Sequence, residues 1–215
     1  MTTRLFAVLF VTVMFSQSLC LAFPEPVSVQ SQGQWTLNVQ YSQPQQIMVD
    51  IPSDPTGKPR RFWYIILTIT NNSLRDVPFY PAFYLSTDTY QIIPSEKRLR
   101  KIVFDKIKVV NQGRYPFLES LDFVGNKILQ GTDNTRDIAV IWPDFDPRAK
   151  NVDLYFAGLS NETAVIEHPT EKDSYGNPEQ VYLSKTLQLS YAIGGDPKLR
   201  QYAKLAPTSK EWVMR

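Results

Sequence analysis

The chain has 215 residues and a formal net charge of +2 at pH 7, with 23 lysines and arginines against 21 aspartates and glutamates. This near-neutral balance argues against a nucleic-acid partner, because binding to phosphate backbones needs a clearly basic face. With one cysteine and one histidine, the chain cannot build a disulfide framework or a histidine-rich metal cluster. The 16 prolines and the 13% aromatic content are typical of a β-rich globular domain.

The first 22 residues have the pattern of a secretory signal peptide. Arg4 gives a positive start, residues 5–15 form an apolar run, and Cys20 and Ala22 are small enough for a signal peptidase site. The apolar run is about half the roughly 20 residues that a membrane span needs. We therefore predict cleavage after Ala22, no membrane span after cleavage, and an exported chain that is periplasmic or extracellular. Residues 23–215 are expected to form a single β-sandwich domain.

Alternation of apolar and polar residues predicts β-strands along most of the mature chain. The clearest case is 34–42, where four apolar side chains alternate with polar ones. In 61–70 both alternating sets are largely apolar, so both faces of this strand are expected to be covered. Pro78 and Pro81 place 77–86 at a sheet edge or bulge. The predicted strands cover residues 34–42, 46–51, 61–70, 77–86, 127–131, 137–142, 151–159 and 181–193, the last and longest.

One helix is expected within this series, over residues 95–109. Ser95 can cap it, and apolar residues such as Leu99 and Ile102 follow at helical spacing. Residues 168–180 are polar and are predicted to be a mobile or binding loop. The order of elements predicts a mainly β fold, an antiparallel immunoglobulin-like β-sandwich with one inserted helix. The large apolar residues expected in its core are Trp35, Trp63, Leu67, Val140 and Leu189.

Several segments resemble a group of exported bacterial proteins whose activity is uncharacterised. FWYIILTITNN at 62–72 is followed by FYLSTDT at 83–89. The likeness continues through ILQG at 128–131, DFDP at 144–147 and GLS at 158–160, and so spans most of the mature chain. The resemblance implies an immunoglobulin-like β-sandwich and implies nothing about activity, cofactor or partner.

Carboxylates beside one predicted turn form a candidate calcium site. Asp144 and Asp146, with Asn151 and Asp153 close by, offer the hard oxygen ligands that Ca²⁺ prefers. They lack the spacing and central glycine of an EF-hand loop, and aspartate before proline is ordinary turn chemistry. Asp144 and Asp146 are therefore the candidate metal ligands, with a turn role as the favoured alternative. Nothing else in the sequence indicates a cofactor.

Three tyrosines form a second candidate site, a flat aromatic platform for a sugar. The alternation within 77–86 places Tyr80 and Tyr84 on one face of a strand, and Tyr90 follows the next turn. Exposed aromatic surface is typical of ligand grooves. Packing between a sheet and the helix explains the same residues, and this structural role is the favoured alternative.

The remaining reactive residues do not define a catalytic site. His168 lies in the predicted polar loop, and no Gly-x-Ser-x-Gly elbow accompanies it. Basic residues gather on and around the predicted helix, where they either form its solvated face or meet an anionic polymer or lipid head group. These residues are Lys97, Arg98, Arg100, Lys101, Lys106 and Lys108.

The leading hypothesis is a noncatalytic exported β-sandwich that serves as a structural or interaction module in the cell envelope. Its expected partner is an envelope protein or a polysaccharide. Two alternatives stay open at this point. One is a carbohydrate-binding module that uses the tyrosines, and the other is a secreted hydrolase whose paired carboxylates are assembled in space rather than in sequence.

Overall fold

The computed structural model describes residues 26–52, 54–95 and 101–215. The predicted signal peptide at residues 1–22 and its cleavage site lie outside the described residues. Three members of the basic group, Lys97, Arg98 and Arg100, also lie outside them. In the described ranges no helix combines the length and apolar character needed to cross a membrane.

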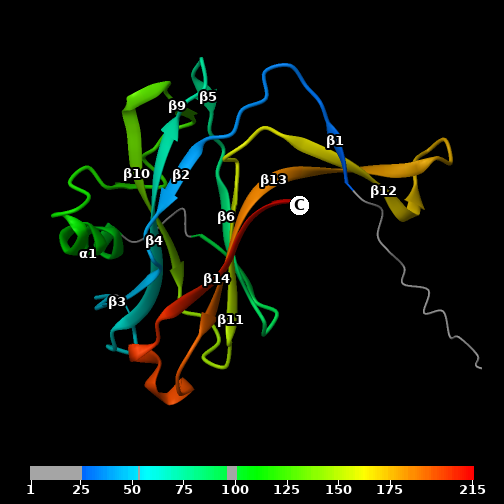
Figure 1. Ribbon diagram of the computed structural model, residues 1–215. Coiled ribbons are helices and arrows are strands. Elements are labelled where there is room, and N and C mark those ends of the chain that lie inside the picture. Colours follow the sequence, from blue (N-terminus) through cyan, green and yellow to red (C-terminus); the bar gives the residue numbers. More distant parts are fainter. Residues whose placement is uncertain (1–25, 53, 96–100) are drawn as a thin grey trace, which may run out of the picture.

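The strands of the described chain form two main sheets, which confirms the mainly β prediction (Figure 1). The larger sheet has the order β1 (Val27–Val29), β12 (Thr163–Lys172), β13 (Pro178–Ile193), β11 (Asn151–Ala157), β6 (Ala82–Thr87) and β7 (Ile92–Pro94), with β14 (Leu205–Met214) also paired to β13. The smaller sheet has the order β2 (Asn38–Tyr41), β4 (Arg60–Asn71), β10 (Gly131–Pro143) and β8 (Glu119–Ser120), with β3 (Gln45–Val49) also paired to β4. All described strand pairs in these two sheets are antiparallel except that of β10 with β8. A separate short pair joins β5 (Val77–Pro78) to β9 (Lys127–Ile128).

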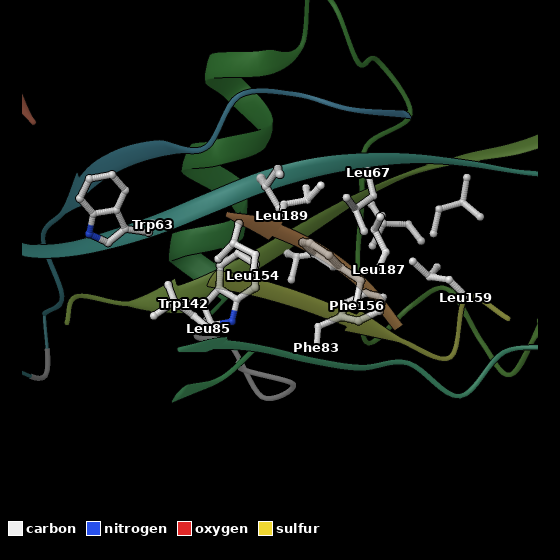
Figure 2. Packing of buried hydrophobic residues seen from close by; sticks show 14 of the residues in the cluster. Trp63, Leu67, Phe83, Leu85, Trp142, Leu154, Phe156, Leu159, Leu187 and Leu189 are labelled. Carbon is white, nitrogen blue, oxygen red and sulfur yellow. The ribbon is translucent and has the colours of Figure 1, made fainter. Parts of the chain in front are cut away.

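The two sheets face each other across one apolar core. Figure 2 shows Leu67 of β4 beside Leu187 of β13 and Phe156 of β11. Trp63 of β4 and Leu189 of β13 belong to the same buried cluster. Val140 belongs to the same buried cluster, and Trp35 packs against it. The predicted core is therefore confirmed. Burial of each large apolar side chain contributes about 1.5–3 kcal/mol, so this cluster holds the two sheets together.

The second face of the smaller sheet is covered by the helix, as the apolar pattern of 61–70 predicts. Helix α1 (Lys101–Asn111) buries Val103 and Ile107 against a second cluster that includes Ile66 of β4 and Ile141 of β10. Lys106 on its outer side donates to the main-chain carbonyl of Met48 in β3, at 2.8 Å. Residues 101–109 of the predicted helix are thus confirmed, and the helix continues two residues beyond the expected end. The predicted cap is wrong, because the Ser95 N–H donates to the Phe83 carbonyl at 2.8 Å and the buried Ser95 hydroxyl has no hydrogen-bond partner among the described residues.

The predicted polar loop at 168–180 is wrong, because most of these residues belong to two paired strands. β12 and the first half of β13 form a hairpin arm that extends away from the stacked sheets, with β1 on the outer edge of β12 (Figure 1). At its tip the Asp173 carboxylate accepts from the N–H groups of Tyr175 and Asn177, both at 2.9 Å. Both faces of the tip meet solvent, so its side chains carry no apolar period and the sequence pattern misses the strands. His168 accordingly lies in a strand.

Two further expectations need correction. The strand predicted over 77–86 is split between β5 and β6, which lie in different sheets, because proline lacks the N–H that a continuous ladder needs. The sequence pattern predicts that the strand at 181–193 is the longest and the last. It is part of β13, the longest described strand, but it is not the last, because β14 follows it. Proline and lysine interrupt the apolar pattern of β14, which lies at a sheet edge.

The arm is attached to the stacked sheets by a defined joint between β11 and β12. Gly158 takes a φ of 86°, and a Cβ there would lie 2.5 Å from the Tyr80 carbonyl oxygen, so only glycine fits. Glu162 forms an ion pair of 2.7 Å with Lys185 and accepts from the Thr36 hydroxyl, also at 2.7 Å. The joint therefore ties β12, β13 and the segment before β2 together.

Candidate functional site

A cleft lies at one end of the stacked sheets. It has a volume of about 660 Å³ and lies between the β2–β3 connection and the chain that leads into β14. That chain includes a 3-10 segment, η1 (Pro197–Tyr202). The cleft is lined by Gln43, Pro44, Gln45, Gln46, Trp63, Gln201, Tyr202, Ala203, Lys204, Leu205 and Pro207.

One glutamine holds the two walls of the cleft together. The Gln46 side-chain amide in β3 donates to the carbonyls of Arg200, Gln201 and Ala203, at 3.2, 2.9 and 2.9 Å. The start of η1 is fixed by Asp196, whose carboxylate accepts from the N–H of Lys198 at 2.8 Å, a typical helix cap. Because these bonds satisfy backbone groups that lack sheet partners, the wall keeps a defined shape.

The lining of the cleft combines apolar surface with amide groups. Pro44, Leu205 and Pro207 contribute apolar surface, and Tyr202 is 72% exposed. The amide of Gln45 already accepts a hydrogen bond from the Tyr64 hydroxyl at 2.8 Å. This mixture of an aromatic ring, apolar residues and a few polar groups is typical of binding clefts.

A smaller and more polar hollow adjoins the cleft and shares Gln201 with it. We call it the arginine hollow; it has a volume of about 360 Å³ and is lined by Arg61, Asp144, Pro147, Lys198, Arg200 and Gln201. Asp144 is the one carboxylate among these lining residues. It accepts from the Trp63 indole N–H at 2.9 Å and from Arg61 Nη1 at 3.1 Å, and its second cation is Arg200, with Nε 3.6 Å away.

The two predicted metal ligands are bound to different arginines. Asp146 takes Arg148 as its partner, with Nη2 2.7 Å from Oδ2. Hydrogen bonds from the side chain and backbone of Arg148 lower the pKa of Asp146 to about 2. In the ranges that the structure describes, no group of three or more His, Cys, Asp or Glu side chains is arranged to hold a metal ion. Calcium binding by Asp144 and Asp146 stays a prediction.

The calcium prediction has a direct test in the melting temperature of the protein with calcium and with chelator. Replacing both Asp144 and Asp146 by Asn would abolish a calcium-induced rise if the carboxylates bind the ion, since removing hard ligands weakens binding and the stabilisation linked to it. A wild-type melting temperature that calcium does not change would leave the two carboxylates with their arginine partners alone.

The three predicted platform tyrosines are not gathered on one surface. Tyr84 of β6 stacks on Tyr155 of β11, with ring centroids 5.0 Å apart, and the Arg215 guanidinium lies over both rings. Tyr80 precedes β6 and lines a separate hollow, whereas Tyr90 lies in the turn after this strand. The length of β6 therefore separates Tyr80 from Tyr90, and Tyr84 packs against a tyrosine of the neighbouring strand in the same sheet rather than between a sheet and the helix.

Sequence reasoning missed the residues that shape the two hollows, above all Gln46, Arg61, Arg200 and Tyr202. Arg61 only looks like the polar start of an apolar strand, and Arg200 lies in a short segment with no periodic pattern. The one local signal is Asp196 before Pro197, a typical start of a helical turn. What gathers these residues is the pairing of β4 with β3 and β10 and the return of the chain into β14.

Comparisons with models of protein families, with curated proteins and with solved structures gave no match to this chain.

Proposed function

We propose that this chain is an exported, noncatalytic immunoglobulin-like β-sandwich that acts as an interaction module in the cell envelope and binds its partner in the cleft beside η1. Export is supported by the N-terminal pattern of charge, apolar run and small residues. The immunoglobulin-like class is supported by the stacking of two mainly antiparallel sheets over one core. The binding role depends on the cleft.

The composition of the cleft lining is the observation that carries this proposal. Proline, glutamine, aromatic and aliphatic residues make up the wall, together with Lys204. Such side chains bind by apolar contact and hydrogen bonding, and the described lining contains none of the His, Asp and Glu residues that most often serve as general acids and bases. The volume of about 660 Å³ lies within the range of about 300–1,000 Å³ that is usual for ligand sites.

A carbohydrate partner is the second candidate, now with the cleft in place of the tyrosine platform. The exposed Tyr202 and the amide side chains of Gln43 and Gln201 line the same cleft. Amide groups both donate and accept, which suits the hydroxyl groups of sugars, and an aromatic face can cover the apolar side of a sugar ring. A polysaccharide and a protein partner are separated by the experiment below.

The test is site-specific photo-crosslinking in the cells that export the protein. A benzophenone amino acid at position 202 is expected to give one discrete adduct, and the same group at Phe123, which is 81% exposed, serves as the matched control. Adducts that protease shortens identify a protein partner, and adducts that only glycosidase shortens identify a polysaccharide. If position 202 gives no adduct, or the same adducts as position 123, the cleft is not the binding site.

A further inference from the structure

The arginine hollow holds more positive charge than its carboxylate can balance. Arg61, Lys198 and Arg200 line it together with Asp144. The nearby Asp146 does not restore the balance, because Arg148 is its own ion-pair partner at 2.7 Å. Three cations against one carboxylate leave an excess of two positive charges at one small concave surface.

Arg200 is the most deeply placed of the three cations. Its side chain is only 6% exposed, and its guanidinium lies 4.3 Å from the centroid of the Phe145 ring. Its two terminal nitrogens reach main-chain carbonyls of Pro147 and Phe145 only at 3.4 and 3.5 Å, which is the long limit of a hydrogen bond. Burial lowers the pKa of Arg200, and the charge of Asp144 opposes this effect.

Two buried donors at this site have no hydrogen-bond partner. They are the Nε atoms of Arg61 and Arg200. A covered donor without a partner destabilises the folded state, and more so when the group is charged. Both arginines line the hollow, and Arg200 also packs against the Phe145 ring. An anion bound there would therefore offset the cost of burying these donors.

We propose that the arginine hollow binds a phosphate group. A phosphate monoester carries about −1.5 to −2 charges near neutral pH, which matches the excess charge, whereas a carboxylate carries only one. The planar guanidinium forks of Arg61 and Arg200 suit the oxygens of phosphate, and Lys198 adds a mobile point charge at the exposed side. Phosphate binding here does not require a partner in the neighbouring cleft, so it goes beyond the proposed interaction role.

Two sources present this chemistry, the free phosphate ion and a phosphate ester carried by an envelope polymer or lipid. The probes are inorganic phosphate and glycerol 3-phosphate, titrated into the purified protein at constant ionic strength and followed by calorimetry and by melting temperature. Binding of inorganic phosphate alone assigns the hollow to the free ion. Binding of both probes shows that the hollow also admits an esterified phosphate.

The variants separate specific binding from general charge. Arg61→Gln and Lys198→Gln are expected to weaken phosphate binding about tenfold each, the effect of losing one charge-assisted hydrogen bond. Arg114→Gln is the matched control, because it removes an exposed arginine that lies outside the lining and leaves the ion pair between Asp146 and Arg148 intact; it is expected to change the affinity by less than about twofold. Melting temperatures in chloride show whether each variant folds, and Arg200 is left unchanged because of its burial.

Three results would overturn the proposal. The first is a failure of both phosphate probes to bind or to raise the melting temperature beyond the effect of chloride. The second is acetate binding as tightly as phosphate, which would show that the site does not select a doubly charged anion. The third is equal phosphate affinity in Arg61→Gln, Lys198→Gln and Arg114→Gln. None of these results depends on the crosslink at position 202, so the two proposals fail independently.

Discussion

The centre of the stacked sheets and the hairpin arm are built from the same antiparallel pairing but are stabilised in different ways. β4 and β10 have buried side chains on both faces over most of their pairing. In the arm, β12 and the first half of β13 are mostly exposed. The central strands are therefore held by apolar burial, and the arm is held by backbone hydrogen bonds, by β1 and by the joint at Glu162. Strand pairing alone does not show how much a segment contributes to stability.

The arm also differs from the centre in its edges. β14 pairs with β13 from Lys185 onward, and Ser184 exchanges both backbone hydrogen bonds with Arg215. Residues 178–183 of β13 have no described partner on that side. Pro178 and Glu179 lie along this stretch, and proline and charge are usual protections of an open edge.

The largest expected effect separates the two regions directly. Leu67→Ala in β4 should lower the free energy of unfolding by about 2–5 kcal/mol, because the side chain is fully buried and its removal leaves a cavity. Tyr182→Ala in the arm, where the ring is 67% exposed, should cost less than about 1 kcal/mol. Chemical denaturation measures both. A loss below about 0.5 kcal/mol for Leu67→Ala would contradict the contrast between centre and arm.

The same contrast explains how much of the fold the sequence predicts. Trp63, Leu67 and Leu189 alternate with neighbours that face another way, so their burial in one core can be predicted from the pattern. The arm cannot be predicted in this way, because a strand exposed on both faces has no apolar period to detect. The turn at Asp173 is the one local signal there, and it is equally typical of a loop.

The candidate site was harder to predict than the core for a related reason. The sequence indicates Asp144 as a candidate because it is a carboxylate beside a predicted turn. Its partners Arg61 and Arg200 are 83 and 56 positions away in the chain, so only the fold brings them together. Hydrophobic patterns carry no information about such pairs. Buried polar contacts of this kind depend on strand register, which a single sequence does not reveal.

The second prediction concerns polar support at the end of the stacked sheets. Asp144→Asn should cost about 1–3 kcal/mol in the free energy of unfolding, because it removes the charge that faces Arg61 and the buried Arg200. Asp146→Asn, whose arginine partner is largely exposed, should have a smaller effect near pH 7. Denaturant unfolding of both variants compares two aspartates of one turn. Equal losses would show that burial of the partner arginine does not decide the contribution.

The third prediction compares a glutamine in each region. Gln46→Ala should cost about 0.5–1.5 kcal/mol and speed amide exchange over residues 198–205, because the clamp on three carbonyls is lost. Gln180→Ala in the arm is the control, since this side chain only accepts from the exposed Tyr182 hydroxyl at 3.2 Å. Hydrogen exchange followed by mass spectrometry measures the two segments. Unchanged exchange over 198–205 in Gln46→Ala would mean that the cleft wall is held by other contacts.

The smallest expected effect is a pH dependence at the joint between the arm and the stacked sheets. The hydrogen bond from Lys185, followed by that from Thr36, lowers the pKa of Glu162 below its ordinary value of 4.5. A group with a lowered pKa in the folded state stabilises that state above its unfolded pKa, and this contribution disappears as the pH falls through the folded value. Acid should therefore loosen the arm before it unfolds the core, because the apolar burial around Leu67 does not titrate.

Amide exchange rates in β12, corrected for the intrinsic effect of pH, should rise between pH 5 and pH 3 in the wild type. Glu162→Gln should already show the faster exchange at pH 5 and little further change at lower pH. If β12 and β4 lose protection together in the wild type, the joint is not an independent unit and the arm is part of the same cooperative structure as the core.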